Sequence, residues 1–411
     1  MRVGEDARRA TPATSVGVVA EQLFAPVPGG IGRYVEAMVA HLPAACADLA
    51  IDVRWIVGNH SAAGVLRAGL DPSNTVRLAL PGRVATRSWV QLRQPPLPRR
   101  LLRRVELVHA TSAAVPPARG RPLVVTVFDL AFLHFPEAFP LAGRRFHERS
   151  LRLTAQEASR VLVPSLATAR DLEQSYGIDP ERIVVTPLGV DVPDADMRGA
   201  EALLHRLGVE GPFLLAVGTL EPRKNLPRLL RAFAACTAAL PDHHLVVVGP
   251  TGWGDQEPLG DAVRGRLGGR IHLAGSVSDP VLHALYERAA LLAYVSLHEG
   301  FGLPVLEAMA HGLPVVTSDT SSMPEVAGDA AVLVDPHDEP AIAAALLRVV
   351  GDERLRTGLR VAGRARAARF TWQETARATS RAYRDVLDAA RLSGPRRAPG
   401  TPGAPIERRE R

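Results

Sequence analysis

Two glutamates eight positions apart, Glu299 and Glu307, frame a glycine-rich turn in this 411-residue chain. Gly300 and Gly302 lie between them, and glycine lets a backbone turn sharply and come close to a ligand. Pro304 marks the start of a short helix, whose first N–H groups and partial positive charge suit a phosphate. Carboxylates accept hydrogen bonds from vicinal hydroxyls. Two carboxylates beside such a helix start therefore indicate a sugar that carries a phosphate.

Two further segments have residue types that bind phosphates. Residues 217–226, VGTLEPRKNL, place Arg223 and Lys224 between an expected strand and an expected helix. Residues 29–34, GGIGRY, follow the first expected strand and open a helical pattern. A glycine-rich turn alone is weak evidence, and an ordinary tight turn with solvated charges is the alternative in both places. Their positions at strand ends, where parallel sheets bind ligands, favour the functional interpretation.

The elements that must position these residues are short apolar runs that alternate with helical patterns. This alternation predicts parallel sheets with right-handed crossovers, and the chain is too long for one core. We therefore expect an α/β fold of two Rossmann-like, doubly wound domains that face a central cleft. The expected strands are 15–21, 53–57, 76–80, 105–110, 122–127, 161–163 and 183–185, followed by 213–217, 245–248, 271–274, 291–295, 315–317 and 331–334.

Turn-forming residues divide the chain. Residues 186–196 are rich in Pro, Gly and Asp and predict a hinge, so we expect an N-terminal domain over 1–190 and a C-terminal domain over 191–371. A final helix is expected over 372–392, and the proline- and arginine-rich tail 393–411 is expected to be disordered. The acidic pair Asp194 and Asp196 does not follow an apolar strand, which favours a solvated linker over a metal site.

Residues 298–310, HEGFGLPVLEAMA, make the strongest pattern, and their glutamates, glycines, proline and flanking strands resemble the signature of retaining glycosyltransferases of family 4. The resemblance covers about 15–390. It implies the GT-B fold, and an enzyme that moves a sugar from a nucleotide-diphospho-sugar with retention at the anomeric carbon. It also implies that the donor lies mainly on the second domain and the acceptor mainly on the first, and that the final helix returns to the first domain.

The resemblance implies roles for single residues. Glu307 is expected to hold the ribose hydroxyls, Glu299 to contact the sugar, and Arg223 with Lys224 to neutralise the departing diphosphate. Strand ends in the second domain are expected to hold the nucleotide base. The expected donor-binding residues are Gly30, Gly218, Thr219, Arg223, Lys224, Gly249, Val277, Gly300, Phe301, Gly302, Leu303 and Glu307, and the catalytic candidates are Glu299, Asp129 and His109.

Two positions depart from the family pattern. Phe128 stands before Asp129 where a histidine is usual, and Thr219 stands where an arginine usually grips the phosphates. The general base is therefore left open between Asp129, His109 and the leaving phosphate itself. His109 has a satisfied strand-end histidine as its alternative, and His134 is expected to be a loop histidine without a catalytic role. The two departures also keep open a degenerate paralogue that binds nucleotide-sugar without turnover.

The charge distribution of the chain indicates which classes of partner it can bind. The net charge is +6, and Arg83, Arg87, Arg93, Arg99, Arg100, Arg103 and Arg104 form a basic stretch. An anionic membrane surface or a solvated loop face are its two interpretations. No nucleic-acid motif accompanies it, so nucleic-acid binding is not expected. The chain has no long apolar run or signal-like start, which predicts a cytoplasmic protein, peripheral on the inner face of the membrane if the stretch binds lipid.

The expected activity needs no cofactor and no metal ion beyond its nucleotide-sugar donor. The amino-acid sequences of residues 29–34 and 221–225 look most like those of bacterial mannosyltransferase-type members that build cell-surface polysaccharide or glycolipid. The alternatives are a natural-product transferase with a small acceptor and a GT-B epimerase, besides the degenerate paralogue. Cys46 and Cys236 lie in alanine-rich segments and are expected to be small buried residues rather than a disulfide or a metal site.

Overall fold

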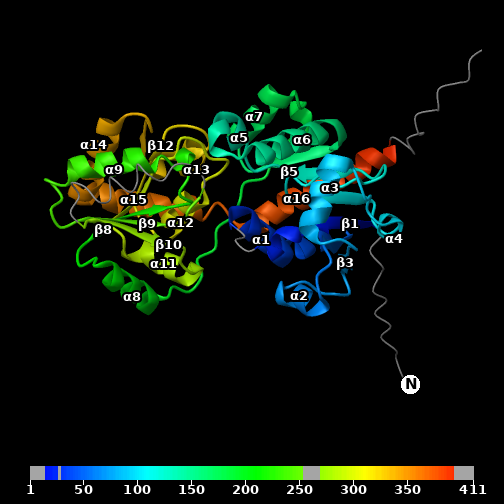
Figure 1. The fold of residues 1–411 in the computed structure, drawn as a ribbon, viewed down its shortest axis with the longest axis horizontal. Helices are drawn as coiled ribbons and strands as arrows, with labels where there is room; N and C mark the ends of the chain where they lie inside the picture. The colour runs from blue at the N-terminus through cyan, green and yellow to red at the C-terminus, as the bar shows by residue number, and fades with distance from the viewer. Residues whose placement is uncertain (1–13, 26–28, 253–268, 393–411) are drawn as a thin grey trace, which may run out of the picture.

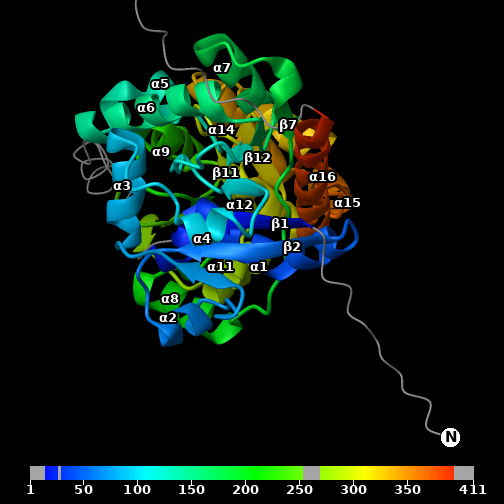
Figure 2. The same cartoon turned by 90° about the vertical axis from the view of Figure 1, so that its right-hand side faces the viewer.

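The structure is a computed structural model that describes residues 14–25, 29–252 and 269–392; the expected disordered tail at 393–411 lies outside the described residues. The described chain forms two parallel sheets, one from each half of the sequence (Figure 1). The strand orders are β3-β2-β1-β4-β5-β6-β7 and β10-β9-β8-β11-β12-β13. Helices lie around each sheet (Figure 2). The predicted α/β class of two Rossmann-like domains is confirmed.

The strands match the expected runs closely because most are short apolar stretches, and central ones such as β4, β5, β11 and β12 are buried on both faces. The first sheet contains β1 (Thr14–Val19), β2 (Ile51–Val57), β3 (Thr75–Arg77), β4 (Leu107–Ala110), β5 (Leu123–Thr126), β6 (Arg160–Val163) and β7 (Ile183–Val185). The second contains β8 (Phe213–Val217), β9 (His244–Val248), β10 (Ile271–Gly275), β11 (Leu291–Tyr294), β12 (Val315–Ser318) and β13 (Val332–Val334).

The crossover helices complete both layers. Those of the first half are α1 (Gly29–Ala47), α2 (Ala62–Arg67), α3 (Gly82–Leu92), α4 (Arg99–Leu102), α5 (Ala131–His134), α6 (Leu141–Glu157) and α7 (Leu166–Tyr176). Those of the second half are α8 (Met197–Leu207), α9 (Leu226–Cys236), α11 (Asp279–Arg288), α12 (Leu303–Ala310), α13 (Met323–Ala327), α14 (Glu339–Gly351) and α15 (Glu353–Ala367), and α16 (Trp372–Leu392) ends the described chain.

Helices α15 and α8 are among those that were not expected from the sequence. The buried face of α15 consists of Leu359, Gly363 and Ala367, and two of these three residues are too small to give a clear apolar period. Helix α8 begins directly after the expected hinge, where the Asp196 side chain accepts a hydrogen bond from the Gly199 N–H at 2.9 Å. Asp196 is thus a helix cap, which agrees with the solvated-linker interpretation of the acidic pair.

Helix α16 packs on the first half although it follows the second. Tyr383 and Met38 of α1 are both fully buried in the shared core. The Thr375 hydroxyl donates to the Pro187 carbonyl at 2.7 Å, and Arg391 donates to the Thr14 hydroxyl at 2.7 Å. The chain therefore crosses between its halves twice, which holds their sheet edges opposite one another. The residue numbers given above for the domain boundaries stay predictions.

Both cysteines are free and buried, as their apolar neighbourhoods indicated. Burial raises the pKa of the Cys46 thiol to about 12, with a smaller contribution from Asp52, and burial raises that of Cys236 to about 11. Neither thiol is a reactive thiolate at neutral pH. In the ranges that the structure describes, we find no helix whose length and hydropathy would let it span a bilayer.

Candidate active site

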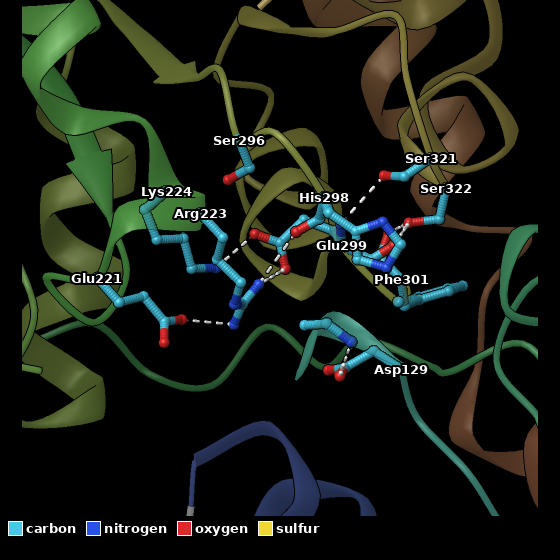
Figure 3. Close-up of polar contacts among 12 residues, drawn as sticks. Asp129, Glu221, Arg223, Lys224, Ser296, His298, Glu299, Phe301, Ser321 and Ser322 are labelled. Carbon is cyan, nitrogen blue, oxygen red and sulfur yellow. Dashed lines mark hydrogen bonds and ion pairs between the residues drawn. The ribbon is translucent and has the colours of Figure 1, made fainter. Parts of the chain in front are cut away.

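The two strongest sequence motifs meet because their strands are neighbours. Strand β8 pairs with β11, so the loops that leave their carboxyl ends lie side by side. The first loop carries Arg223 and Lys224, and the second carries Glu299, 75 positions further along than Lys224. Figure 3 shows these three side chains pointing toward one another. The parallel topology therefore builds the site that the spacing alone only indicated.

Glu299 is the centre of a buried charge network. Its Oε1 accepts a hydrogen bond from Lys224 Nζ at 2.6 Å, and its Oε2 accepts one from Arg223 at 2.7 Å (Figure 3). Oε1 also accepts a hydrogen bond from the Tyr294 hydroxyl at 2.8 Å. Burial by itself raises the pKa of Glu299, but Arg223 and Lys224 outweigh it and hold that pKa well below its usual range. The site thus contains a fixed carboxylate that is only 6% exposed.

The side chains of Arg223 and Lys224 both form ion pairs with carboxylates of the protein. Arg223 forms a second ion pair with Glu221 at 2.7 Å, so Arg223 and Lys224 face the two carboxylates of Glu221 and Glu299. Burial lowers the pKa of Lys224, and the negative charge of Glu299, which raises that pKa, offsets only part of the shift. An incoming anion would compete with Glu299 for both cations. The geometry therefore suits a ligand that brings its own negative charge and, elsewhere, a partly positive group for Glu299.

Ser321 and Ser322 form hydrogen bonds to the backbone of the turn between Glu299 and Glu307. Gly302 is the N-cap of α12 with φ +107°, a conformation that favours glycine. The Ser322 hydroxyl is within 2.9 Å of both the Glu299 and Phe301 carbonyls, and the Ser321 hydroxyl accepts from the Glu299 N–H at 3.0 Å (Figure 3). The turn before α12, whose first residue is Leu303, is thus held by three side-chain hydrogen bonds.

Gly300 is required by a contact between the two halves. A Cβ at this position would lie 1.9 Å from the Phe128 carbonyl oxygen and 2.9 Å from the Asp129 Cβ. The Ser165 hydroxyl also donates to the Gly300 carbonyl at 2.7 Å. The sequence interpretation assigned the close approach at this glycine to a ligand. In the structure its immediate neighbour is the backbone after β5, so the turn is a joint of the domains as well as a part of the site.

Glu307 lies on α12, 5% exposed, and both of its oxygens have partners. The Tyr286 hydroxyl of α11 donates to Oε2 at 2.9 Å, and Arg33 of α1 pairs with Oε1. Arg33 also pairs with Asp279 at 2.8 Å. Burial alone would lower the pKa of Arg33, but Glu307 and Asp279 outweigh it and raise that pKa above its usual range.

Arg33 and Tyr286 are site residues that the sequence reasoning missed. Arg33 follows the glycine run directly, so its position was a usable signal. Tyr286 lies on a helix with no motif of its own. The glycine run itself reaches the site, because a Cβ on Gly30 would lie 3.6 Å from the Leu303 side chain. The first half therefore contributes to the same place as the second.

Two hollows adjoin these residues. The larger has a volume of about 310 Å³ and lies between α1, the hinge and α11–α12, with Arg33, Asp279 and Glu307 in its wall. The smaller, of about 20 Å³, is lined by Gly218, Thr219, Lys224 and Tyr294 among others. The larger reaches the lower end of the size range of small-molecule sites. It has room for part of a nucleotide beside Glu307.

Gly249, which is expected near the nucleotide base, packs on Gly218 of the expected diphosphate loop. Gly218 and Gly249 have φ +147° and +150°, and a Cβ on Gly249 would lie 2.0 Å from the Gly218 carbonyl oxygen. Thr219 follows Gly218 at the same strand end, and Val277 lies half-buried between β10 and α11. These residues line the carboxyl edge of the second sheet as expected, and their contact with a ligand stays a prediction.

Asp129 lies at the junction of the halves, close to the Gly300 turn (Figure 3). Its Oδ1 accepts a hydrogen bond from the Ala131 N–H at 3.0 Å. Phe128, which stands where the family has a histidine, packs edge to face on Tyr34 with ring centroids 5.1 Å apart. The departure at this position thus replaces a polar group by an apolar contact, and Asp129 lies beside the Gly300 turn as an acidic candidate from the first half.

His109 does not face the site. It is fully buried, and its two ring nitrogens lie 2.6 Å from the Tyr383 hydroxyl and 2.8 Å from the Thr126 hydroxyl. Burial lowers its pKa to about 3. This geometry favours the alternative interpretation of a satisfied strand-end histidine that ties β4 to α16.

Comparisons with known proteins agree with the geometry. Residues 28–193 match the model of "Glycosyltransferase Family 4", and residues 205–366 match "Glycosyl transferases group 1". The chain is 34% identical over 273 residues to an O-antigen chain mannosyltransferase B of Escherichia coli, an alignment that covers 65% of this chain and 71% of that protein. It is 35% identical over 302 residues to a D-inositol 3-phosphate glycosyltransferase of Salinispora arenicola, which covers 66% and 65%.

Among solved structures, the fold is similar to that of Anabaena Alr3699/HepE, whose complex contains UDP and glucose. The TM-score is 0.66 at 21% identity, and the alignment covers 92% of this chain and 100% of that chain. At this identity the similarity shows the shared fold.

Proposed function

Since this chain belongs to the glycosyltransferases of family 4 and has their GT-B fold, we propose that it transfers a sugar from a nucleotide-diphospho-sugar to an acceptor hydroxyl, with retention at the anomeric carbon. The observation that carries the proposal is the buried Glu299 carboxylate, held by Arg223 and Lys224 beside the start of α12. Arg223 and Lys224 can bind a diphosphate, and Glu299 beside them can stabilise an electron-poor sugar ring.

The donor's parts map onto separate groups. Glu307 accepts hydrogen bonds from the ribose hydroxyls once Arg33 yields its Oε1, and the 310 Å³ hollow takes the nucleoside end. Arg223, Lys224 and the N–H groups at Gly302–Leu303 hold the diphosphate. Thr219 contributes one neutral hydroxyl where the family has an arginine, so Arg223 is the guanidinium that remains. Strand ends at Gly249 and Val277 lie near the base.

In the reaction, the bond between the anomeric carbon and the diphosphate oxygen breaks, and the acceptor oxygen bonds to the same carbon. Glu299 stabilises the positive charge that develops on the ring, and Arg223 with Lys224 stabilises the departing diphosphate. The acceptor's proton passes to an oxygen of the leaving phosphate. Asp129 is the alternative proton acceptor, because it lies beside the Gly300 turn.

The charge needed for the departing diphosphate is supplied by the chain, so we propose catalysis without a metal ion or other cofactor. The donor sugar is proposed to be mannose and the acceptor a cell-surface polysaccharide, glycolipid or lipid-linked glycan, because the E. coli relative is named an O-antigen chain mannosyltransferase. A small acceptor is the second candidate. The relatives named for inositol phosphate support it.

We further propose a cytoplasmic protein that associates with the inner face of the membrane through α3 and α4. Six of the seven arginines of that stretch are exposed, whereas Arg93 is engaged by Glu157 and by the Val115 carbonyl at 2.7 Å. Cosedimentation with anionic vesicles, compared between the unaltered protein and a variant with Arg99, Arg100, Arg103 and Arg104 changed to glutamate, tests this. Equal sedimentation of both would contradict it.

The first experiment is a binding and hydrolysis screen of the purified protein against GDP-mannose, UDP-glucose, UDP-N-acetylglucosamine and a dTDP-sugar, with EDTA present. Selective binding with release of the nucleoside diphosphate supports a metal-independent transferase and identifies the donor. Binding without turnover, with acceptor mixtures added, supports the degenerate paralogue that Phe128 and Thr219 left open. Absence of binding to every donor would overturn the site assignment.

A further inference from the structure

Three side chains next to the Glu299 network form a second cluster, at the junction of the two halves. His134 ends α5, Asp171 lies on α7, and His298 precedes Glu299 in the loop after β11. The Nε2 atoms of His134 and His298 lie 3.1 Å and 3.6 Å from the same oxygen, Oδ2 of Asp171. The two imidazole rings stack with centroids 4.3 Å apart. One potential ligand atom of each residue lies within 4.8 Å of the others.

These distances are close to those of a metal site. Zinc binds imidazole nitrogen and carboxylate oxygen at about 2.0–2.2 Å, which puts the ligand atoms of a tetrahedral site about 3.3 Å apart. Two imidazoles and one carboxylate are also donors that zinc, cobalt and nickel accept. We propose that His134, Asp171 and His298 bind one divalent transition-metal ion of the zinc type, which clamps the two halves together.

Burial and charge support this assignment. The His298 and Asp171 side chains are 11% and 19% exposed, whereas that of His134 is 42% exposed, so an ion can enter from the His134 side. The Asp171 carboxylate offsets part of the charge of the ion.

The ligands come from both halves. Helices α5 and α7 belong to the first half and lie on the side that faces α13 of the second (Figure 1). The α7 start already bonds across the junction, through the Leu166 N–H to Glu325 Oε2 at 2.8 Å. The His298 carbonyl accepts from Arg223 at 3.2 Å, so an ion on the His298 ring would also restrain the loop that carries Glu299. The ion would therefore hold the cleft closed, apart from the chemistry at Glu299.

The test is calorimetric titration of the full chain, without a histidine tag and after removal of EDTA, with zinc chloride in a buffer that does not chelate metals. We expect one ion per chain, and at least about tenfold weaker binding in both His134→Ala and Asp171→Asn. The matched control is His205→Ala, which removes an exposed histidine of α8 and keeps the site. Wild-type binding no tighter than that of the two variants would overturn the proposal and leave the cluster as a hydrogen-bonded network.

A second readout separates binding from the effect on the fold. A ligand that binds the native state raises the unfolding temperature. Zinc should therefore raise the melting temperature of the wild type and of His205→Ala, but not of His134→Ala or Asp171→Asn. An equal zinc-induced rise in all four would place the ion elsewhere. Neither readout depends on the proposed transferase activity.

Discussion

At the scale of the residue, Glu299 is a carboxylate that stays ionised although it is buried. Three hydrogen-bond donors, from Lys224, Arg223 and Tyr294, make this possible, since a buried charge is tolerated when it is paired and hydrogen-bonded. The same three donors fix the carboxylate in one orientation. A diphosphate that takes over Arg223 and Lys224 would free Glu299 toward the sugar. Donor binding and catalytic charge are thus coupled through the same cations.

Replacement of Lys224 tests this coupling. Lys224→Ala should weaken nucleotide-sugar binding by about 1–3 kcal/mol, the range of a charged hydrogen bond. Glu307→Ala should also weaken it, through the ribose. Arg231→Ala, which removes an exposed ion pair between Arg231 of α9 and Glu339 of α14, is the control and should bind normally. Calorimetry with the donor found in the screen gives all four affinities. Unchanged affinity in both site variants would refute the assignment.

The buried His109 predicts a pH dependence of stability. Its folded pKa of about 3 lies below the usual value of 6.5, so between these two values the unfolded chain binds a proton that the folded chain does not. The free energy of unfolding should therefore fall as pH falls below about 6.5, with about 1.4 kcal/mol per pH unit from this group until about pH 3.

His109→Gln isolates that contribution, because His283, whose pKa burial lowers to about 4, acts in the same direction in both proteins. Urea unfolding of each protein between pH 4 and pH 7 measures the two slopes. The variant should show the shallower one. Parallel slopes would mean that His109 takes up its proton in the folded state.

At the scale of the element, the start of α12 depends on glycine for its shape. Gly302 has φ +107°, and a Cβ there would lie 2.3 Å from the terminal carbon of Met323. Gly302→Ala should lower the free energy of unfolding by about 1–3 kcal/mol from backbone strain. Gly358→Ala is the matched control, because that exposed glycine of α15 has open space, and it should raise stability by about 0.5–1 kcal/mol. Denaturant titration that gave both changes the same sign would contradict the argument.

At the scale of the whole molecule, contacts across the cleft determine how the halves stand before a donor arrives. Arg33 joins α1 to both Glu307 and Asp279, and Ser165 bonds to the Gly300 carbonyl. Domain motion of this kind gates turnover in many enzymes. Arg33 holds the cleft closed by pairing with Glu307, the carboxylate proposed to bind the ribose. Donor binding at Glu307 must therefore break this ion pair.

Arg33→Ala should therefore shift the donor-free protein toward more open shapes. Small-angle X-ray scattering should show a larger radius of gyration for this variant than for the wild type. Arg377→Ala, which breaks an ion pair with Glu374 inside α16, removes the same charge without affecting the cleft and should scatter like the wild type. If Arg33→Ala gave the wild-type radius, the remaining contacts across the junction would be sufficient to hold the closed form.

The sequence by itself determined the elements and the second-half site. Apolar runs bounded by glycine and proline predict strands such as β8 and β11, and the spacing of Glu299, Gly302 and Glu307 predicts a turn and a helix start, because these are local properties of the chain. Once two such strands are neighbours in a parallel sheet, their carboxyl ends must meet. Arg223, Lys224 and Glu299 were therefore predictable as a group before any coordinates.

Only the tertiary structure decided what faces these residues from the other half. The pairing of Arg33 with Glu307 spans 274 positions, as does the bond of His109 to Tyr383, and the chain sequence between them has no pattern that reports such contacts. The same holds for the Gly300 contact with Phe128 and for the His134, Asp171 and His298 cluster. The physical reason is that local patterns encode strands and helices, whereas contacts between domains depend on the packing of both sheets and on the return of α16.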